Sequence, residues 1–222
     1  MARAGLADGL YVITDHGAAT LPGLVRRVEQ ALRGGARLVQ YRDKQAGRAE
    51  RCARARALLE LCRQQGVALI INDDVGLAAE IGAHGVHLGR DDMAITAART
   101  RLGPEALIGA SCYNRLERAR AAVSEGADYV AFGAFFASHS KPGAIPASPD
   151  LLTQARRELP VPVVAIGGIT PANGAGLVAA GANLLAVIHG VFGQPDIQAA
   201  AHAYAGLFER MSRRMSGMSS EE

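Results

Sequence analysis

A short run of apolar and β-branched residues returns eight times along this chain, and no other feature constrains its fold as strongly. The runs are LYVIT (10–14), RLVQYR (37–42), ALIIND (68–73), GVHLG (85–89), LIGASC (107–112), YVAFGA (129–134), VVAIGG (163–168) and LLAVIH (184–189). Segments long enough for a helix follow them, as at residues 21–35 and 48–66. Strands that are apolar on both faces and separated by helices form a parallel sheet covered by helices. The sequence therefore predicts an α/β fold.

Eight such units within 222 residues fit a closed (β/α)8 barrel, the TIM barrel. The alternative is a doubly wound open sheet, which favours about five or six strands and a glycine-rich turn after the first. Here the first run ends in Thr14, Asp15 and His16, without a GxGxxG sequence. We therefore predict one TIM-barrel domain over residues 1–210, followed by a disordered tail over residues 211–222.

Charge and composition exclude several classes of partner. The net charge is only +3, and the chain has no basic tract and no tryptophan, so nucleic-acid binding is not expected. No apolar run reaches the length of a membrane span, and the first residues lack the apolar core of a secretory signal, so no membrane partner is expected. The three cysteines show no metal-binding spacing, which favours reduced thiols in a cytoplasmic protein. A homo-oligomer is compatible with the sequence.

The second run ends in QYRDK, where Gln40, Arg42 and Lys44 alternate along the chain. Alternate residues of a strand project to the same side, so two cations and an amide meet at one strand end. In a (β/α)8 barrel the carboxyl ends of the strands carry the chemistry. One interpretation is an anion site, and the other is an ordinary ion pair of Arg42 or Lys44 with Asp43.

Acidic residues follow the next two runs. Asn72 and Asp73 end the third run, and Asp91 and Asp92 come after the fourth. Neighbouring parallel strands lie about 4.8 Å apart, so these carboxylates can converge on one cation. Oxygen ligands without Cys or His favour Mg²⁺, which takes one or two carboxylates together with water and phosphate. The alternative is helix capping by Asp74 and by Asp91 or Asp92, and the residues alone favour neither interpretation.

The sequence shows no persuasive nucleophile. Ser111 and Cys112 end the fifth run, but no residue is evident as their base, so we expect a hydrogen-bonding or core role. His16, His84 and His87 are expected to be structural, because a buried histidine with satisfied ring nitrogens is the commoner case.

Two further strand ends suggest phosphate binding. The loop after the sixth run, FFASHSKPGAIPAS, offers Ser138, Ser140 and Lys141, although a polar surface loop would look the same. Gly167 and Gly168 end the seventh run and expose backbone N–H groups where this fold commonly binds phosphate. The chain thus offers one anion site with a metal and one without, which indicates two small phosphorylated substrates.

In this order and spacing, the motifs resemble the thiamine phosphate synthase family. They are LYVITD, QYRDK, INDD, GVHLGRDD, IGASCYN, ADYVAFGAFFASHSK, VVAIGGIT and LLAVIHGVFG, and they cover about residues 10–193. The resemblance implies a transferase of thiamine biosynthesis that needs Mg²⁺. Such an enzyme joins hydroxymethylpyrimidine diphosphate to a phosphoethyl thiazole, in its simple or carboxylated form, and releases pyrophosphate. The family's route is dissociative, through a pyrimidine cation that the thiazole nitrogen captures.

The resemblance also implies roles for single residues, all named here by their positions in this chain. Arg42, Lys44, Ser111 and Lys141 would be catalytic, Asp73 and Asp92 would bind Mg²⁺, and Asp74 would only start the next helix. The substrate-binding residues would be Gln40, Tyr41, Arg42, Asp43, Lys44, Asn72, Ser111, Ser138, His139, Ser140, Lys141, Gly168, Ile188 and His189. Among them, Ser138, Ser140, Gly168, Ile188 and His189 would line the thiazole phosphate site.

The chain departs from the family pattern in two places. Ser138 and Ser140 replace two threonines, which keeps the hydroxyls, and His189 replaces a serine that bonds the thiazole phosphate. A thiazole tautomerase on the same barrel is an alternative, but its catalytic histidine stands where this chain has Cys112 and Tyr113. A non-catalytic phosphate-binding barrel is a second alternative, which only the His189 departure supports.

Overall fold

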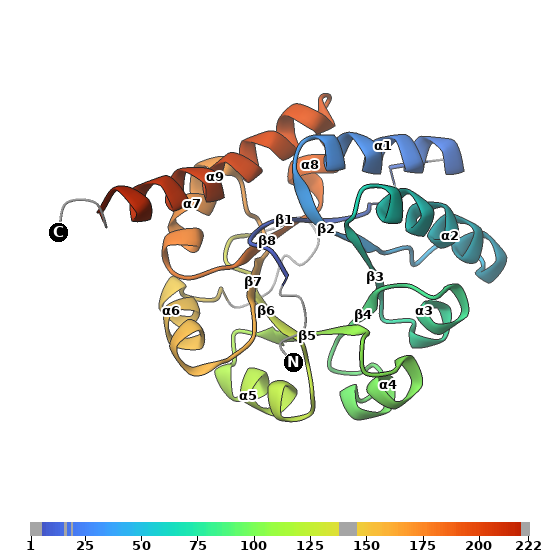
Figure 1. The fold of residues 1–222 in the computed structure, drawn as a ribbon, viewed down its shortest axis with the longest axis horizontal. Coiled ribbons are helices and arrows are strands. Elements are labelled where there is room, and N and C mark those ends of the chain that lie inside the picture. The colour runs from blue at the N-terminus through green and yellow to red at the C-terminus, as the bar shows by residue number, and fades with distance from the viewer. Residues whose placement is uncertain (1–5, 16, 19, 138–145, 219–222) are drawn as a thin grey trace.

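Eight parallel strands close into a barrel in which each strand pairs with the next and β8 pairs with β1 (Figure 1). The computed structural model describes residues 6–15, 17–18, 20–137 and 146–218. The strands are β1 (Gly9–Ile13), β2 (Ala36–Tyr41), β3 (Ala68–Asn72), β4 (Gly85–Leu88), β5 (Leu107–Tyr113), β6 (Tyr129–Gly133), β7 (Val163–Ile166) and β8 (Leu184–Val187). The prediction of a (β/α)8 TIM barrel is confirmed.

Helices surround the barrel on all sides (Figure 1). They are α1 (Leu21–Arg33), α2 (Arg48–Gln64), α3 (Val75–Ile81), α4 (Ile95–Leu102), α5 (Leu116–Ser124), α6 (Pro149–Glu158), α7 (Pro171–Ala179), α8 (His189–Phe192) and α9 (Ile197–Met218). The long helix α9 packs against α1 and α7, and it runs past residue 210, where the sequence placed the end of the domain. Within the described ranges, none of these helices could cross a membrane.

The observed strands stop before the ends of several predicted runs. After β7, Gly167 and Gly168 have φ angles of 104° and 63°, so the chain turns out of the sheet there. After β8, Ile188 caps the short helix α8, which begins at His189. Asp73 and Asp92 lie beyond the last residues of β3 and β4, whereas Gln40, Asn72 and Ser111 lie within their strands.

Alternation along each strand divides the core into two parts. Inward side chains such as Tyr11, Leu38 and Tyr129 fill the barrel, while their strand neighbours pack outward against the helices. Both tyrosines are fully buried. Gln40 shares the inward face of β2 with Leu38 and is also buried, which places an amide group inside the barrel.

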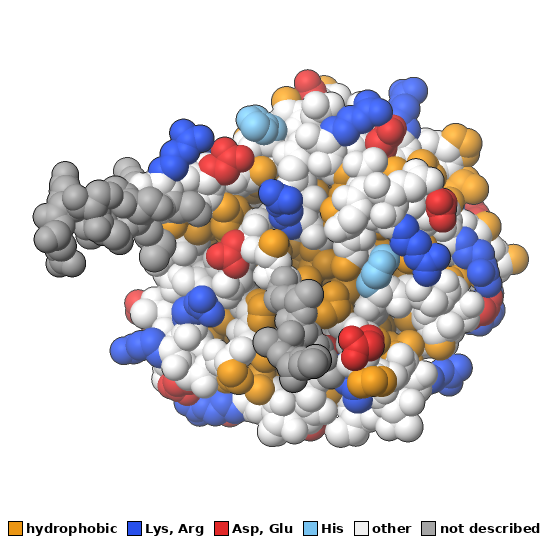
Figure 2. Space-filling view, in the orientation of Figure 1, with side chains coloured by type: hydrophobic (Ala, Val, Ile, Leu, Met, Phe, Trp, Pro, Cys, Tyr) orange, Lys and Arg blue, Asp and Glu red, His pale blue; other side chains and the backbone are white. Residues whose placement is uncertain are grey.

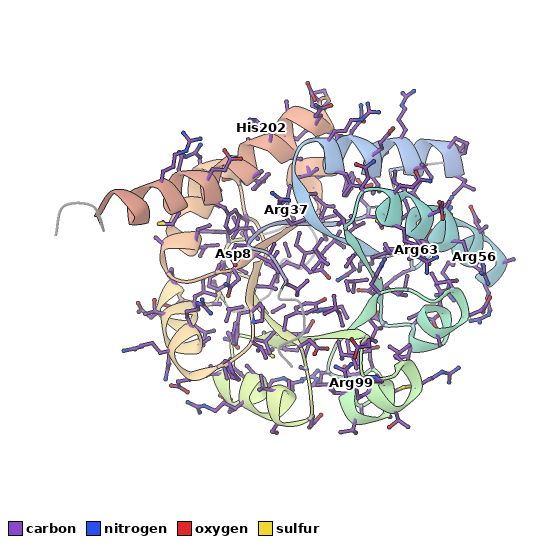
Figure 3. All side chains as sticks on the ribbon, viewed as in Figure 1. Asp8, Arg37, Arg56, Arg63, Arg99 and His202 are labelled. Carbon is purple, nitrogen blue, oxygen red and sulfur yellow. The ribbon has the colours of Figure 1, made fainter. Side chains whose placement is uncertain are left out.

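The amino ends of the strands lie at the opposite end of the barrel. A hollow of about 150 Å³ lies there between α9 and the starts of β1 and β2, and Asp8, Arg37 and His202 are part of its lining (Figure 3). Figure 2 shows basic and acidic side chains interspersed around this face, without a large area of one sign. None of the residues that line the hollow was predicted for the functional site.

Candidate active site

The carboxyl ends of β2, β3 and β4 bring together the residues that were predicted to bind a metal and an anion. Asp73 follows β3, and its carboxylate lies beside that of Asp92, which comes from the loop after β4. Lys44, beyond the end of β2, places its Nζ atom 3.4 Å from Asp73 Oδ2. Burial and then the Asp92 carboxylate raise the pKa of Asp73 above its ordinary value, against the opposing charge of Lys44.

Backbone contacts hold this acid pair in place. Asp73 adopts a left-handed conformation, with φ of 61°, and its N–H donates to the carbonyl oxygen of His87 over 2.9 Å. Asp92 Oδ2 accepts a hydrogen bond of 2.6 Å from the N–H of Gly89. A Cβ atom at Gly89 would lie 2.9 Å from the same oxygen, so the absence of a side chain lets the carboxylate approach. The two carboxylates thus come from adjacent strand ends to one place.

Helix capping explains one of these acids and not the others. Asp74 is the N-cap of α3, and its Oδ1 accepts a hydrogen bond of 2.8 Å from the N–H of Leu77, as predicted. Helix α4 is capped by Ala94, without a side-chain hydrogen bond. The capping interpretation of Asp91 and Asp92 is therefore wrong.

The donor set fits a hard divalent cation. Two carboxylates, with Asn72 at the end of β3 directly before Asp73, supply only oxygen and amide groups. In the described part of the chain, His, Cys, Asp and Glu form no metal-binding group of three or more. Two carboxylates suit Mg²⁺, which completes its shell with water and substrate phosphate, better than they suit the nitrogen- and sulfur-seeking metals.

The end of β2 is fixed by Thr14 and by helix α2. The Thr14 hydroxyl accepts from the N–H of Arg42 over 2.9 Å and donates to its carbonyl oxygen over 3.1 Å. Asp43 pairs with Arg54 of α2 at 2.9 Å, and it accepts from the N–H groups of Gln45 and Ala46. The alternative in which Asp43 pairs with Arg42 or Lys44 is not what the structure shows.

Tyr41 and Asp43, both predicted to bind substrate, have side chains that support this segment. Tyr41 packs into the outer core, and its hydroxyl lies 3.3 Å from Asp43 Oδ2. Burial alone would raise the pKa of Asp43, but the backbone N–H groups of Ala46 and Gln45 and the Arg54 guanidinium outweigh it and hold the pKa below its ordinary value. Asp43 is thus ionised and held within the fold.

A row of hydrogen bonds crosses the barrel interior from Gln40 to Ser111. Gln40 Nε2 donates to the Tyr11 hydroxyl over 2.6 Å, and that hydroxyl lies 3.0 Å from the Tyr129 hydroxyl. Tyr129 lies 3.2 Å from His87 Nδ1, and His87 Nε2 lies 2.9 Å from Ser111 Oγ. Sequence reasoning missed the two tyrosines, although their inward strand positions were a signal.

Ser111 hydrogen-bonds to His87, in line with the expected hydrogen-bonding role, and this nearby ring nitrogen was not evident from the sequence. Burial lowers the pKa of His87 to about 4, and its second ring nitrogen faces a tyrosine rather than a carboxylate. Both features make it a weak general base at neutral pH.

Burial raises the pKa of the Cys112 thiol to about 12, which leaves it inert. His84, whose Nδ1 accepts from the N–H of Leu69, is structural as predicted, and His16 lies outside the described residues.

The ends of β7 and β8 form the second predicted site. A Cβ atom at Gly168 would lie 2.5 Å from the carbonyl oxygen of Ala137, so this turn fits against the segment after β6 only as glycine. His189 is exposed, and its ring lies where a Cβ atom of Gly193 would be. Ile188 is half-buried beside it. The other predicted residues of this site and its surroundings, Ser138, His139, Ser140 and Lys141, lie outside the described residues.

The barrel and its mouth define the class of protein: a (β/α)8 enzyme with polar and charged groups at the carboxyl ends of its strands. A family model described as thiamine monophosphate synthase matches residues 10–191. The chain belongs to this family, as the sequence motifs predicted, and it is therefore a transferase of thiamine biosynthesis.

Individual relatives agree with the family assignment. The chain is 51% identical to the thiamine-phosphate synthase of Thioalkalivibrio sulfidiphilus, over 90% of this chain and 95% of the relative. It is 52% identical to the thiamine-phosphate synthase of Marinobacter nauticus, over 94% of each chain. Among solved structures, thiamine phosphate pyrophosphorylase from Pyrococcus furiosus superposes with a TM-score of 0.83 at 34% identity, over 91% of this chain and 96% of that one.

Proposed function

We propose that this protein is a Mg²⁺-dependent thiamine phosphate synthase, which joins hydroxymethylpyrimidine diphosphate to a phosphoethyl thiazole and releases pyrophosphate. The observation that carries the proposal is the pair of carboxylates, Asp73 and Asp92, with the Lys44 ammonium 3.4 Å from one of them. Two acids and a cation at the carboxyl ends of adjacent strands suit a metal-bound diphosphate. We place the reaction in the cytoplasm, in line with the three free cysteines.

The residues around the acid pair divide between metal and substrate. Asp73 and Asp92 would hold Mg²⁺, and the bound ion would supply positive charge for the leaving pyrophosphate. Lys44 and Arg42 bind the diphosphate oxygens, and Thr14 keeps the Arg42 backbone in place. Tyr41 and Asp43 act as supports of this strand end, with any contact to substrate made through their backbone.

The pyrimidine ring is held by Gln40, Asn72 and Ser111, and Lys141 adds a cation to the diphosphate. The thiazole phosphate binds at Gly168, Ile188 and His189, with the hydroxyls of Ser138 and Ser140. The C–O bond breaks before the thiazole nitrogen attacks, so the enzyme needs charge neutralisation and positioning rather than a covalent nucleophile. The inert Cys112 thiol and the weak base beside Ser111 agree with this route.

The test is to mix the two phosphorylated precursors with the purified protein and to follow thiamine phosphate and pyrophosphate. We expect both products with Mg²⁺ and neither after chelation with EDTA, with recovery when Mg²⁺ is restored. Product formation that is unaffected by EDTA would refute the metal role. Binding of both precursors without product would favour the non-catalytic barrel.

A further inference from the structure

Five polar side chains form a continuous row through the barrel interior, and each comes from a different strand. They are Gln40 of β2, Tyr11 of β1, Tyr129 of β6, His87 of β4 and Ser111 of β5. The first four are buried, and Ser111 at the end is partly exposed. The row thus links two proposed pyrimidine-binding residues, Gln40 and Ser111, through groups with no assigned role.

Donor and acceptor capacity gives the row a direction. The Gln40 amide nitrogen can only donate, so the Tyr11 oxygen accepts, and the single proton of Tyr11 is left for the Tyr129 oxygen. The Tyr129 hydroxyl in turn donates its hydrogen bond to His87 Nδ1. A neutral imidazole that accepts at Nδ1 carries its proton at Nε2, and this proton faces Ser111 Oγ at 2.9 Å.

We propose that this row fixes His87 as the Nε2–H tautomer and thereby makes Ser111 a hydrogen-bond donor. Because Ser111 Oγ accepts from His87, its own proton is left for an acceptor atom of the bound pyrimidine diphosphate. This last step rests on the proposed function, whereas the tautomer does not. Tyr11, Tyr129 and His87 are positioning residues, since they act on the substrate only through Ser111.

Burial explains why the direction is maintained. Tyr11, Tyr129 and His87 are enclosed by strand side chains, where a donor or acceptor left without a partner costs on the order of 1–3 kcal/mol. Reversing the row would require the Gln40 amide to turn over and every following proton to move. A change at one residue therefore cannot turn the Ser111 hydroxyl from a donor into an acceptor unless that change breaks the row.

The tautomer can be measured directly by ¹⁵N NMR of the imidazole ring in the purified protein. We expect the wild type to show His87 protonated at Nε2. Tyr129→Phe removes the donor to Nδ1 and should produce a mixture of tautomers. Tyr204→Phe is the matched control, because it removes an equally buried hydroxyl that donates to the Ile169 carbonyl oxygen, outside the row, so the Nε2–H form should persist. An Nδ1–H form in the wild type, or the same change in both variants, would overturn the proposal.

Turnover supplies the second measurement. Ser111→Ala should lower kcat on the order of 100-fold, as the loss of one positioned donor does elsewhere. Tyr129→Phe should lower it roughly tenfold, and the double variant should be no slower than Ser111→Ala alone, because both changes remove the same bond. Losses that multiply in the double variant would contradict the proposed coupling. A wild type without synthase activity would refute the proposed function, and the NMR result would still decide the tautomer.

Discussion

Asp73 has a backbone conformation that few non-glycine residues adopt, and this conformation positions its carboxylate. Keeping an aspartate at φ of 61° costs on the order of 1 kcal/mol, which the hydrogen bond from its N–H to His87 helps to offset. The turn directs the side chain toward Asp92 and away from the helix that Asp74 caps. Two neighbouring carboxylates repel each other, so a bound cation would relieve the free protein of that repulsion.

Asp73→Asn should lower kcat at least about 100-fold, because it removes one of the two acids that we propose for Mg²⁺. Asp74→Asn is the matched control: asparagine caps a helix as well as aspartate does, so turnover and melting temperature should stay near those of the wild type. Steady-state kinetics across a Mg²⁺ titration measures both variants. Near-normal turnover of Asp73→Asn at low Mg²⁺ would rule out its role as a ligand.

His189→Ser should leave the KM for the phosphoethyl thiazole unchanged or lower it, since a serine hydroxyl can donate the same bond from a smaller side chain. Gly193→Ala tests the converse, because the new methyl group would meet the His189 ring at 2.2 Å and displace it. The KM of both variants can be compared at saturating pyrimidine diphosphate. A KM that rises tenfold or more in His189→Ser would show that this chain uses the imidazole itself.

At the scale of elements, the end of β2 is stabilised from two sides. Thr14 of the segment after β1 contacts the Arg42 backbone, and α2 supplies Arg54 to Asp43. The side chains of Asp43 and Arg54 are only 6% and 14% exposed, so this ion pair is far better shielded than the surface pair of Arg33 and Glu29. The orientation of Arg42 and Lys44 therefore depends on helix α2 as well as on the strand.

Asp43→Asn should destabilise the protein by roughly 1–3 kcal/mol at neutral pH, because it leaves Arg54 without this carboxylate. The lowered pKa of Asp43 gives the pH dependence: the stabilisation is complete above the ordinary value of 3.8 and is lost as the pH falls through the lower folded value. The stability difference between the variant and the wild type, measured by urea unfolding, should therefore begin to shrink as the pH falls below 3.8 and should vanish only below the folded pKa. Glu29→Gln, which breaks an exposed pair, is the control and should have little effect. A difference that persists at acid pH would contradict the role of the charge.

At the scale of the whole molecule, the barrel could be predicted because its strands are buried on both faces. Such strands appear as continuous apolar runs, and all eight runs overlap the observed strands. The acid pair was also predictable, since Asp73 and Asp92 follow consecutive strands. The interior row was not, because Tyr11 and Tyr129 are 118 residues apart and meet only through the closure of the barrel. The backbone conformation of Asp73 likewise depends on a contact with β4.

Binding of Mg²⁺ and pyrophosphate together should raise the melting temperature of the whole protein. A ligand present at 100 times its Kd adds about 2.7 kcal/mol, which for a chain of this size corresponds to roughly 5–10 °C. Thermal unfolding with Mg²⁺ alone, pyrophosphate alone and both tests this. Asp92→Asn should remove the part of the shift that needs Mg²⁺. An equal shift with pyrophosphate and EDTA would argue against a metal-bound diphosphate.

The pairing of Gly9 with Leu184 has a consequence for how the chain is made. A ribosome releases β1 first, yet the partner on one side of β1 is the last strand to emerge. Until β8 arrives, the growing sheet has two open edges with unpaired N–H and C=O groups, which are templates for aggregation. The closed barrel, which has no free edge, can therefore form only after β8 has emerged, and nascent chains that pause before β8 should depend most on chaperones.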